Sequence, residues 1–456
     1  MNKMRQYFSS NILIGAFLKH LPALCSTHTT KADILCAAAI AVTGSAFLYL
    51  AHFGITHPWL NTLLGLLFLY LLLPAGARTW FFTGAFLSLL WFWWIALSFL
   101  HYHMAWAIPL VLLFIALVYG TLFWLIAKTA ELLINKSVAT QRIPKLFTIH
   151  YSLFTLSLKA LGLLGLSYVH PFTFDWFKPE LMFTESDFGI RKWQFAAILA
   201  ALVLVHWRKS LLFLPLVLLA WQPVPQITGT IDAGITLVTT HTPVEAKWNK
   251  TKQPAQFQKL FAAIDDAIDA NKSIVVLPES VFPVFLNRNQ KLFDALHERS
   301  KRINIVTGAL YWDGKTPRNA AYIFTKDGRV RVANKVILVP FGEANPLPDF
   351  LSDWVNRVFY DNAVDYKADA VISDYTIERK TYRNAICFEA TSEPLYRGNP
   401  KRMIVLSNNG WFVPSIEPTL QRILLQYYSR KYGTTIYHAV NMAPSYTIVR
   451  GNVVTQ

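Results

Sequence analysis

Residues 384–390 read Asn-Ala-Ile-Cys-Phe-Glu-Ala, a short apolar stretch that ends on the thiol of Cys387. Two other reactive side chains lie beside similar stretches upstream. Glu279 follows Val-Val-Leu-Pro at 275–278, and Lys335 lies between Ala-Asn and Val-Ile. An acid, a lysine and a thiol beside strand-like runs are the parts of a covalent acyl-transfer site. One cysteine alone would be weak evidence, but three reactive groups in matching contexts predict a catalytic domain built on β-strands.

The composition indicates a membrane protein. Of the 456 residues 54% are hydrophobic and 15% are charged, against roughly 25% charged in soluble domains. The net charge of +16 could suggest nucleic acid, but no basic run with interleaved aromatic residues is present. We therefore expect no nucleic-acid partner and attribute the charge to cytoplasmic loops and to attraction for anionic lipid.

The three cysteines do not form a disulfide framework. Cys25 and Cys36 lie near the first apolar segment, far in sequence from Cys387, so a free thiol is expected in the C-terminal half. The apolar stretch at residues 11–18 is short for a signal peptide and is followed at once by a lysine. Residues 1–32 are therefore interpreted as a cytoplasmic or interfacial lead-in.

The next part of the chain, residues 33–222, is predicted to be a transmembrane domain of about seven helices. The last two apolar segments are short for the ~20 residues that a span needs, and one long bent hairpin is an alternative there. The segments lie at residues 34–53, 59–75, 80–100, 107–126, 147–169, 193–206 and 211–221.

The lysines and arginines of this half predict its orientation. Arg78, Lys128 and Arg208 lie in alternate loops, whereas loops 54–58 and 101–106 carry neither residue type. Cytoplasmic loops are enriched in these residues, so the N-terminus is expected inside and the C-terminal half outside, in a bacterial periplasm. Lys159 lies within the fifth segment, where a charge is costly; pairing, snorkelling and a substrate role are all open.

From residue 228 onward, β-rich apolar runs alternate with amphipathic helices, which predicts an α/β domain with some antiparallel pairs. Asp327-Gly328 predicts a hairpin turn directly before Lys335. No glycine-rich phosphate loop or metal-ligand cluster is present, so no cofactor and no metal are expected. Helices are predicted at 256–271, 292–303 and 416–430, and strands at 235–240, 273–277, 304–311, 320–325, 330–333, 381–387 and 402–407.

The order Pro278-Glu279, Asn334-Lys335 and Cys387-Phe388-Glu389 resembles the nitrilase (carbon–nitrogen hydrolase) superfamily. With the polytopic half, the chain resembles the membrane-bound branch of that superfamily, the apolipoprotein N-acyltransferases. The resemblance covers nearly the whole chain. Three further motifs fit it: Lys-Trp at 247–248, Val-Pro-Phe-Gly-Glu at 339–343 and Ser-Asn-Asn-Gly-Trp-Phe at 407–412.

The resemblance implies a fold and a reaction. The expected fold is a polytopic α-helical membrane domain followed by an αββα sandwich at residues 228–456, in the periplasm at the bacterial inner membrane. The expected reaction moves a fatty acyl chain from a phospholipid, through a thioester, to the α-amine of a diacylated apolipoprotein; we expect a monomer. By this resemblance the catalytic triad is Glu279, Lys335 and Cys387, the supporting residues are Glu343, Glu389 and Phe388, and the substrate-binding residues are Trp248 and Trp411.

Several alternatives remain open at this stage. Glu343 and Glu389 could take part in chemistry or form structural ion pairs, and Trp248 could be a packed rim aromatic. A membrane-tethered amidase would use the same triad, and a transporter or scaffold with a degenerate domain is a third class. The triad argues against the degenerate domain, and the apolar surroundings favour an acyltransferase, which must exclude water from its thioester.

Two departures from the family pattern and one further segment complete the interpretation. Phe388 occupies a position where the family usually has tyrosine. The family commonly has a further span after the catalytic domain, and no such apolar segment is expected here before Gln456. Residues 346–360 place apolar side chains at helical spacing, with acidic residues off that face. This amphipathic segment is interpreted as a lid that guides a lipid tail, with packing on the domain's own sheet as the alternative.

Overall fold

The structure is a computed structural model, and it describes residues 30–139, 148–225, 232–344 and 366–454. It consists of two compact units. The first holds the helices between residues 30 and 223. Two loops of that stretch, His101–His103 and Val169–Lys178, belong instead to the second unit, together with the chain from Val224 onward. The predicted lid at residues 346–360 lies outside the described residues.

Each span that the sequence predicts contains a helix in the structure. Among the described residues, three helices are long and apolar enough to cross a membrane, at Thr30–His52, Ala77–His101 and Ala105–Leu133. Lys209 ends helix α8 in a left-handed conformation (φ 50°), so the last two predicted spans are separate elements joined by a turn. The elements are α2 (Thr30–His52), α3 (Pro58–Leu72), α4 (Ala77–Phe92), η1 (Trp93–Leu97), α5 (Ser98–His101), η2 (Ala105–Ala107), α6 (Ile108–Ala139), α7 (Thr148–Leu166), η5 (Pro179–Phe183), α8 (Lys192–Arg208) and η6 (Leu211–Ala220). The short helix η4 (Pro171–Thr173) lies in the loop that belongs to the second unit.

Lys159, the charge inside the fifth predicted span, is bound at the end of a neighbouring helix. Its Nζ donates to the main-chain oxygen of Ala75, just after α3, at 2.6 Å. On the other side of the same turn, the carboxylate of Glu131 accepts the main-chain N–H of Ala77, at the start of α4, at 2.9 Å. Helix ends leave such groups unsatisfied and carry matching partial charges. Both side chains therefore serve as caps of the α3–α4 turn.

The second unit contains two six-stranded sheets. The first has the order β1-β2-β4-β5-β6 with β3 beside β4, and the second has the order β12-β11-β10-β9-β8-β7. In each sheet a parallel centre is extended by antiparallel strands. The strands are β1 (Ile235–Leu237), β2 (Ile274–Val276), β3 (Phe282–Phe285), β4 (Asn304–Trp312), β5 (Pro317–Phe324), β6 (Val330–Asn334), β7 (Asp374–Ile377), β8 (Lys380–Ile386), β9 (Arg402–Asn408), β10 (Thr435–Asn441), β11 (Tyr446–Val449) and β12 (Asn452–Val454).

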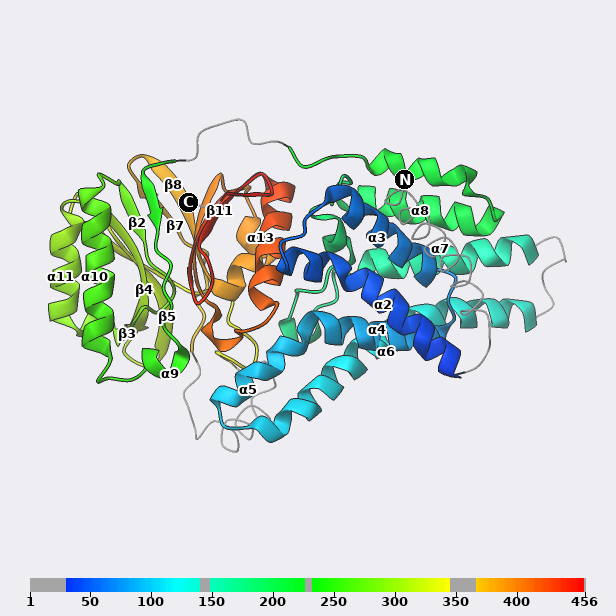
Figure 1. The fold of residues 1–456 in the computed structure, drawn as a ribbon, viewed down its shortest axis with the longest axis horizontal. Helices are drawn as coiled ribbons and strands as arrows, with labels where there is room; N and C mark the ends of the chain where they lie inside the picture. Colours follow the sequence, from blue (N-terminus) through cyan, green and yellow to red (C-terminus); the bar gives the residue numbers. More distant parts are fainter. Residues whose placement is uncertain (1–29, 140–147, 226–231, 345–365, 455–456) are drawn as a thin grey trace, which may run out of the picture. The chain divides into compact units, whose positions relative to one another are not determined.

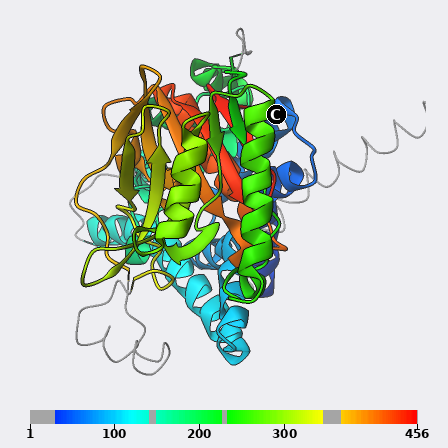
Figure 2. The same ribbon diagram turned by 90° about the vertical axis from the view of Figure 1, so that its left-hand side faces the viewer.

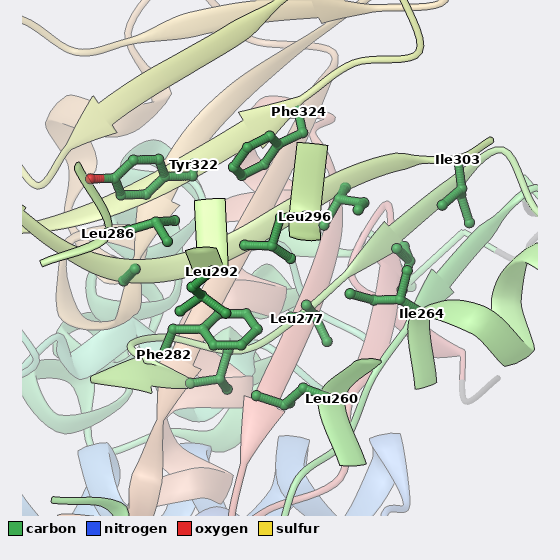
Figure 3. Packing of buried hydrophobic residues seen from close by; sticks show 14 of the residues in the cluster. Leu260, Ile264, Leu277, Phe282, Leu286, Leu292, Leu296, Ile303, Tyr322 and Phe324 are labelled. Atoms are coloured by element: carbon green, nitrogen blue, oxygen red, sulfur yellow. The ribbon is translucent and has the colours of Figure 1, made fainter. Parts of the chain in front are cut away.

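Helices cover the outer faces of the two sheets (Figure 1). Helix α10 (Gln253–Asp269) buries Leu260, Ile264 and Ile268, which recur on one face, against the first sheet. Helix α11 (Gln290–Ser300) lies beside it, and Figure 2 shows both helices in front of the strands. Figure 3 shows the core that they share with β4 and β5, with Leu296 packed among the labelled residues.

A second core fills the space between the sheets, where Val306 and Ile323 of the first sheet meet Ile404 and Leu406 of the second. Helix α13 (Glu417–Tyr432) packs against β10 and β11 on the outer side of the second sheet. The layers are therefore helix, sheet, sheet, helix. This confirms the predicted αββα sandwich.

The structure adds strands β3, β7, β10, β11 and β12 to those that the sequence predicted. Strand β10 is buried along almost its whole length and carries His438 and Asn441 among apolar residues, so it shows no alternating pattern. The other four strands have three or four residues each. The remaining connections are the short helices α9 (Val244–Lys247), η7 (Leu286–Arg288), η8 (Cys387–Thr391), η9 (Glu393–Tyr396) and η10 (Asn409–Trp411).

The strand directions bring the predicted site residues to one edge of the sandwich. Strand β6 runs parallel to β4 because both pair antiparallel with β5. A parallel bridge between Thr240 and Asn441 aligns β1 of the first sheet with β10 of the second. The carboxyl ends of β2, β6 and β8 therefore share an edge, and Glu279, Lys335 and Cys387 follow these ends.

Candidate active site

Lys335 lies at the centre of a buried cluster of polar side chains. It follows β6 directly and is 1% exposed. Its Nζ lies 2.7 Å from Oε2 of Glu343 and 3.7 Å from Oε1 of Glu279. Burial by itself would lower the pKa of Lys335, but the carboxylates of Glu343 and Glu279 outweigh it and raise that pKa above its usual value. Lys335 is therefore an ammonium at any physiological pH.

Asn319 of β5 links the two carboxylates to each other. Its Nδ2 donates to Oε1 of Glu279 at 2.7 Å and to Oε1 of Glu343 at 2.9 Å. The main-chain N–H of Val339 donates to the remaining oxygen of Glu343, Oε2, at 2.9 Å. Each carboxylate is thus held by hydrogen bonds in addition to the ammonium, which fixes both side chains without consuming their charge.

Glu279 reaches this position through a tight backbone turn at the end of β2. Ser280, the next residue, has a φ of +45°, a conformation that side-chain-bearing residues seldom adopt. The turn runs close to Gly308 of β4, where a Cβ would lie 2.4 Å from the main-chain nitrogen of Ser280 and 2.7 Å from Cα of Glu279. Any side chain at position 308 would displace the carboxylate.

Cys387 follows β8 and begins the short helix η8. It is a free, partly buried cysteine with a φ of +52°. Nε2 of Gln421, on α13, donates to its Sγ at 3.8 Å. Burial raises the pKa of the Cys387 thiol, the Glu279 carboxylate raises it further, and Lys335 opposes both. The resting thiol is therefore protonated, and its electrostatic partners are the predicted acid and lysine.

Glu389 ties the segment after Lys335 to the segment before Cys387. Its Oε2 accepts the main-chain N–H of Val336 at 2.7 Å and that of Ile337 at 3.2 Å. Its Oε1 accepts the N–H of Ile386 at 2.7 Å. Burial raises the pKa of Glu389 to about 7, although Lys335 and these N–H groups oppose the shift. Glu389 therefore holds the main chain after Lys335 and the main chain before Cys387 in fixed positions.

Phe388 is held by two aromatic residues from a loop between membrane helices. Its ring is 4% exposed and stacks on Phe174 and on Trp176, with centroids 6.0 Å away in each case. Trp176 is fixed in turn by a hydrogen bond from its Nε1 to Oγ1 of Thr391 at 2.7 Å. The loop at Val169–Lys178 thus packs beside the predicted nucleophile.

The two tryptophans predicted to contact substrate lie in different surroundings. Trp248 follows α9 and its side chain is exposed. Trp411, in η10, stacks on Tyr102 with ring centroids 5.7 Å apart and an interplanar angle of 19°. His101 meets the edge of the same indole and also lies 2.9 Å from Glu245. Within the described residues, no hydrogen bond joins either tryptophan to Glu279, Lys335 or Cys387.

Proteins of similar sequence show the family to which this chain belongs. A relative in Wolinella succinogenes named apolipoprotein N-acyltransferase is 40% identical over 413 residues, which are 89% of this chain and 93% of that protein. The chain belongs to the apolipoprotein N-acyltransferase family. The model of that family's integral membrane domain matches residues 31–223. Members in Helicobacter pylori and Campylobacter jejuni are 33% and 30% identical, over 85% and 93% of this chain and 87% and 91% of theirs.

Membership of this family makes the chain a bacterial membrane-bound acyltransferase. Among solved structures, a CN-hydrolase superfamily protein from Xanthomonas campestris aligns with a TM-score of 0.37 at 14% identity, over 48% of this chain and 83% of that one. The sandwich architecture rests on the strand order described above and not on this loose superposition.

Sequence motifs did not identify every polar group of this candidate site. Asn319 was missed because it lies inside a strand with no motif around it. Gln421 and Glu417 of α13 were also missed. Burial raises the pKa of Glu417 to about 8, and Nδ2 of Asn409 donates to Glu417 at 2.5 Å and to Gln421 at 3.2 Å. Within the described residues no three His, Cys, Asp or Glu side chains are grouped as metal ligands would be.

Proposed function

We propose that Cys387 is the nucleophile of this N-acyltransferase, carrying a fatty acyl chain from a phospholipid to the α-amine of an apolipoprotein's diacylglyceryl-cysteine. The observation that carries the proposal is the buried cluster of Lys335, Glu279 and Glu343 within electrostatic reach of a free thiol. A protonated thiol needs a base during attack, and Glu279 is the carboxylate that influences the thiol most.

In the first half-reaction the sulfur of Cys387 attacks the ester carbonyl of the phospholipid, and Glu279 takes the thiol proton. A carbon–sulfur bond forms, and the carbonyl oxygen carries the negative charge of the tetrahedral intermediate. The Lys335 ammonium and the main-chain N–H of Phe388 stabilise this charge. The carbon–oxygen bond then breaks, the leaving alkoxide takes the proton from Glu279, and lysophospholipid departs.

In the second half-reaction the neutral α-amine of the acceptor attacks the thioester. A carbon–nitrogen bond forms and the carbon–sulfur bond breaks, which returns the thiolate. Glu279 accepts the amine's proton and passes it to the sulfur, so the free enzyme is regenerated. Amines attack thioesters more readily than they attack oxygen esters, which is the chemical reason for a sulfur carrier. The sequence is ping-pong.

The roles of the other predicted residues follow from their contacts. Glu343 holds Lys335 in place, and Glu389 holds the backbone on both sides of the site. Exposed Trp248 and stacked Trp411 are proposed substrate contacts. The relatives in Wolinella succinogenes, Helicobacter pylori and Campylobacter jejuni are named apolipoprotein N-acyltransferase, which favours acyl transfer over the amidase alternative.

The proposal includes a place for the reaction. Residues 1–32 form the lead-in, 33–222 the membrane domain and 228–456 the catalytic domain, which faces the periplasm at the inner membrane as a monomer. Support for this orientation comes from the lysines and arginines of alternate loops, such as Arg78 and Lys128. Labelling of engineered cysteines in the catalytic domain is expected from the periplasmic side, and labelling from the cytoplasm alone would refute the orientation.

Intact-mass measurement tests the covalent step. Incubation of the purified protein with phospholipid alone should add the mass of one acyl chain, which hydroxylamine should remove. The variant Cys387→Ala should stay folded in membranes, gain no acyl mass and lose transfer to a diacylated lipopeptide. An unmodified wild-type mass under conditions that support transfer would refute the thioester. Release of free fatty acid without transfer to the lipopeptide would instead favour hydrolysis.

A further inference from the structure

Lys247 places a second buried ammonium beneath Glu279. It is the last residue of α9 and is 2% exposed. Its Nζ donates to the main-chain oxygen of Glu279 at 2.9 Å. Removing an ammonium from water is costly unless charged partners compensate it, and one carbonyl is a weak partner. The compensating groups that the structure provides are the Glu279 carboxylate and Cys387, both of which interact with Lys247 electrostatically.

The charges of the site explain what this cation adds. Lys335 carries +1 and its two ion-pair partners, Glu279 and Glu343, carry −1 each, so the paired trio sums to −1. Lys247 offsets this excess.

Two further buried carboxyl groups face the site: Glu417 of α13 acts electrostatically on Cys387, and Glu389 on Lys335. Each adds negative charge where it is ionised. Removal of Lys247 would therefore leave a larger uncompensated negative charge in a buried, weakly screening environment.

We propose that Lys247 is a positioning residue whose positive charge offsets the excess negative charge of the site, so that the Cys387 thiolate can form. The proposal rests on the proposed chemistry of Cys387. Lys247 acts through Glu279, whose main-chain oxygen it binds, and it makes no contact with the reacting carbonyl. Burial lowers the pKa of Lys247 to about 8, with Glu279 and Cys387 opposing the shift, so Lys247 is charged at pH 7.

A purely mechanical role is the competing explanation. The bond from Lys247 to the Glu279 carbonyl could serve only to hold the turn after β2, next to Gly308. The two roles differ in one measurable property. A mechanical clamp changes how well Glu279 is placed at every pH, whereas a compensating charge favours the reactive thiolate of Cys387 only at pH values where Lys247 is charged.

The test is the pH dependence of iodoacetamide alkylation, followed by mass spectrometry of the peptide that contains Cys387 in the full-length protein in detergent. Lys247→Met should lower the alkylation rate about tenfold at pH 7, where Lys247 is charged, and by much less at pH 9, above the pKa of Lys247. Lys247→Arg keeps the charge and should alkylate at least as fast as the wild type at both pH values. Lys259→Met, an exposed lysine on α10, is the matched control and should behave like the wild type.

Three results would overturn the proposal. The first is a Lys247→Met protein with slow acylation but a wild-type alkylation rate at pH 7, which is the signature of a clamp. The second is a Lys247→Arg protein that alkylates as slowly at pH 7 as Lys247→Met. Lys247→Gln covers the case in which Lys247→Met does not fold, because it keeps a polar donor without the charge; a wild-type alkylation rate at pH 7 there is the third. Alkylation reports on the thiol itself, so a failure of the acyl-transfer mechanism would show separately as a missing acyl mass.

Discussion

A comparison of Lys159 in the membrane unit with Lys335 in the catalytic unit distinguishes a structural charge from a proposed catalytic one. Lys159 in the membrane unit is 3% exposed and Lys335 in the catalytic unit is 1% exposed, so burial does not distinguish them. Their partners do. Lys159 binds the main-chain oxygen of Ala75, whereas Lys335 binds two carboxylates. A carbonyl cannot gain or lose a proton, but a carboxylate can, so the arrangement around Lys335 responds directly to a proton that moves during a reaction. Lys247 also binds a carbonyl, but that carbonyl belongs to Glu279 itself.

The strongest test of this comparison is the removal of each ammonium. Lys335→Met should abolish formation of the acyl-enzyme, with a loss of at least about a thousandfold, because it removes the proposed oxyanion partner and leaves Glu279 and Glu343 facing each other. Intact mass after incubation with phospholipid measures the effect. Lys301→Met, at an exposed ion pair, is the control. A Lys335→Met protein that acylates at the wild-type rate would remove the distinction between the two lysines.

The placement of Glu279, Lys335 and Cys387 at one edge of the sandwich could be predicted, because each lies beside a recognisable apolar run and strand ends collect along such an edge. The contacts around these residues could not. Asn319 binds a carboxylate 40 residues away, and Trp176 binds Thr391 across 215 residues. No local pattern encodes such contacts. Strand β10 escaped prediction for a related reason, since a strand buried on both faces has no alternation.

Glu389 extends the comparison to a carboxyl group that accepts hydrogen bonds from the main-chain N–H groups of Val336, Ile337 and Ile386. Its pKa is about 7 in the folded protein and near 4.5 in the unfolded chain. Between these values the folded state binds more protons, so the free energy of unfolding is greatest below about pH 4.5, falls as the pH rises to about 7 and is constant above. The contribution is about 3 kcal/mol for the full window.

Urea unfolding of the protein at pH 5 and pH 8 measures this dependence. The difference in unfolding free energy between the two values should be smaller in Glu389→Gln than in the wild type, because the amide does not titrate. Glu378→Gln, at a partly exposed ion pair, should keep the wild-type difference. Equal pH dependence in Glu389→Gln and the wild type would show that this carboxyl does not titrate in the window.

Lys159→Met tests the structural half of the comparison. Loss of the charged hydrogen bond to Ala75 should lower the stability of the membrane unit by roughly 1.5–3 kcal/mol, while the rate of acyl transfer per folded molecule stays at the wild-type value. Thermal inactivation in detergent measures the first quantity and single-turnover transfer the second. Glu131→Gln, at the other side of the turn, should give a similar loss of stability. A fall in the transfer rate without a fall in stability would instead return Lys159 to the substrate pathway.

Trp176 gives the smallest expected effect and the finest test of how loop Val169–Lys178 contributes. Trp176→Phe keeps an aromatic ring against Phe388 but loses the hydrogen bond to Thr391. Trp176→Ala loses both. If stacking holds the main chain of Phe388 in place, the alanine variant should slow acyl-enzyme formation about tenfold, which corresponds to ~1.4 kcal/mol, and the phenylalanine variant should slow it less. If both variants slow it equally, the hydrogen bond to Thr391 rather than the ring stack positions the residue after the nucleophile.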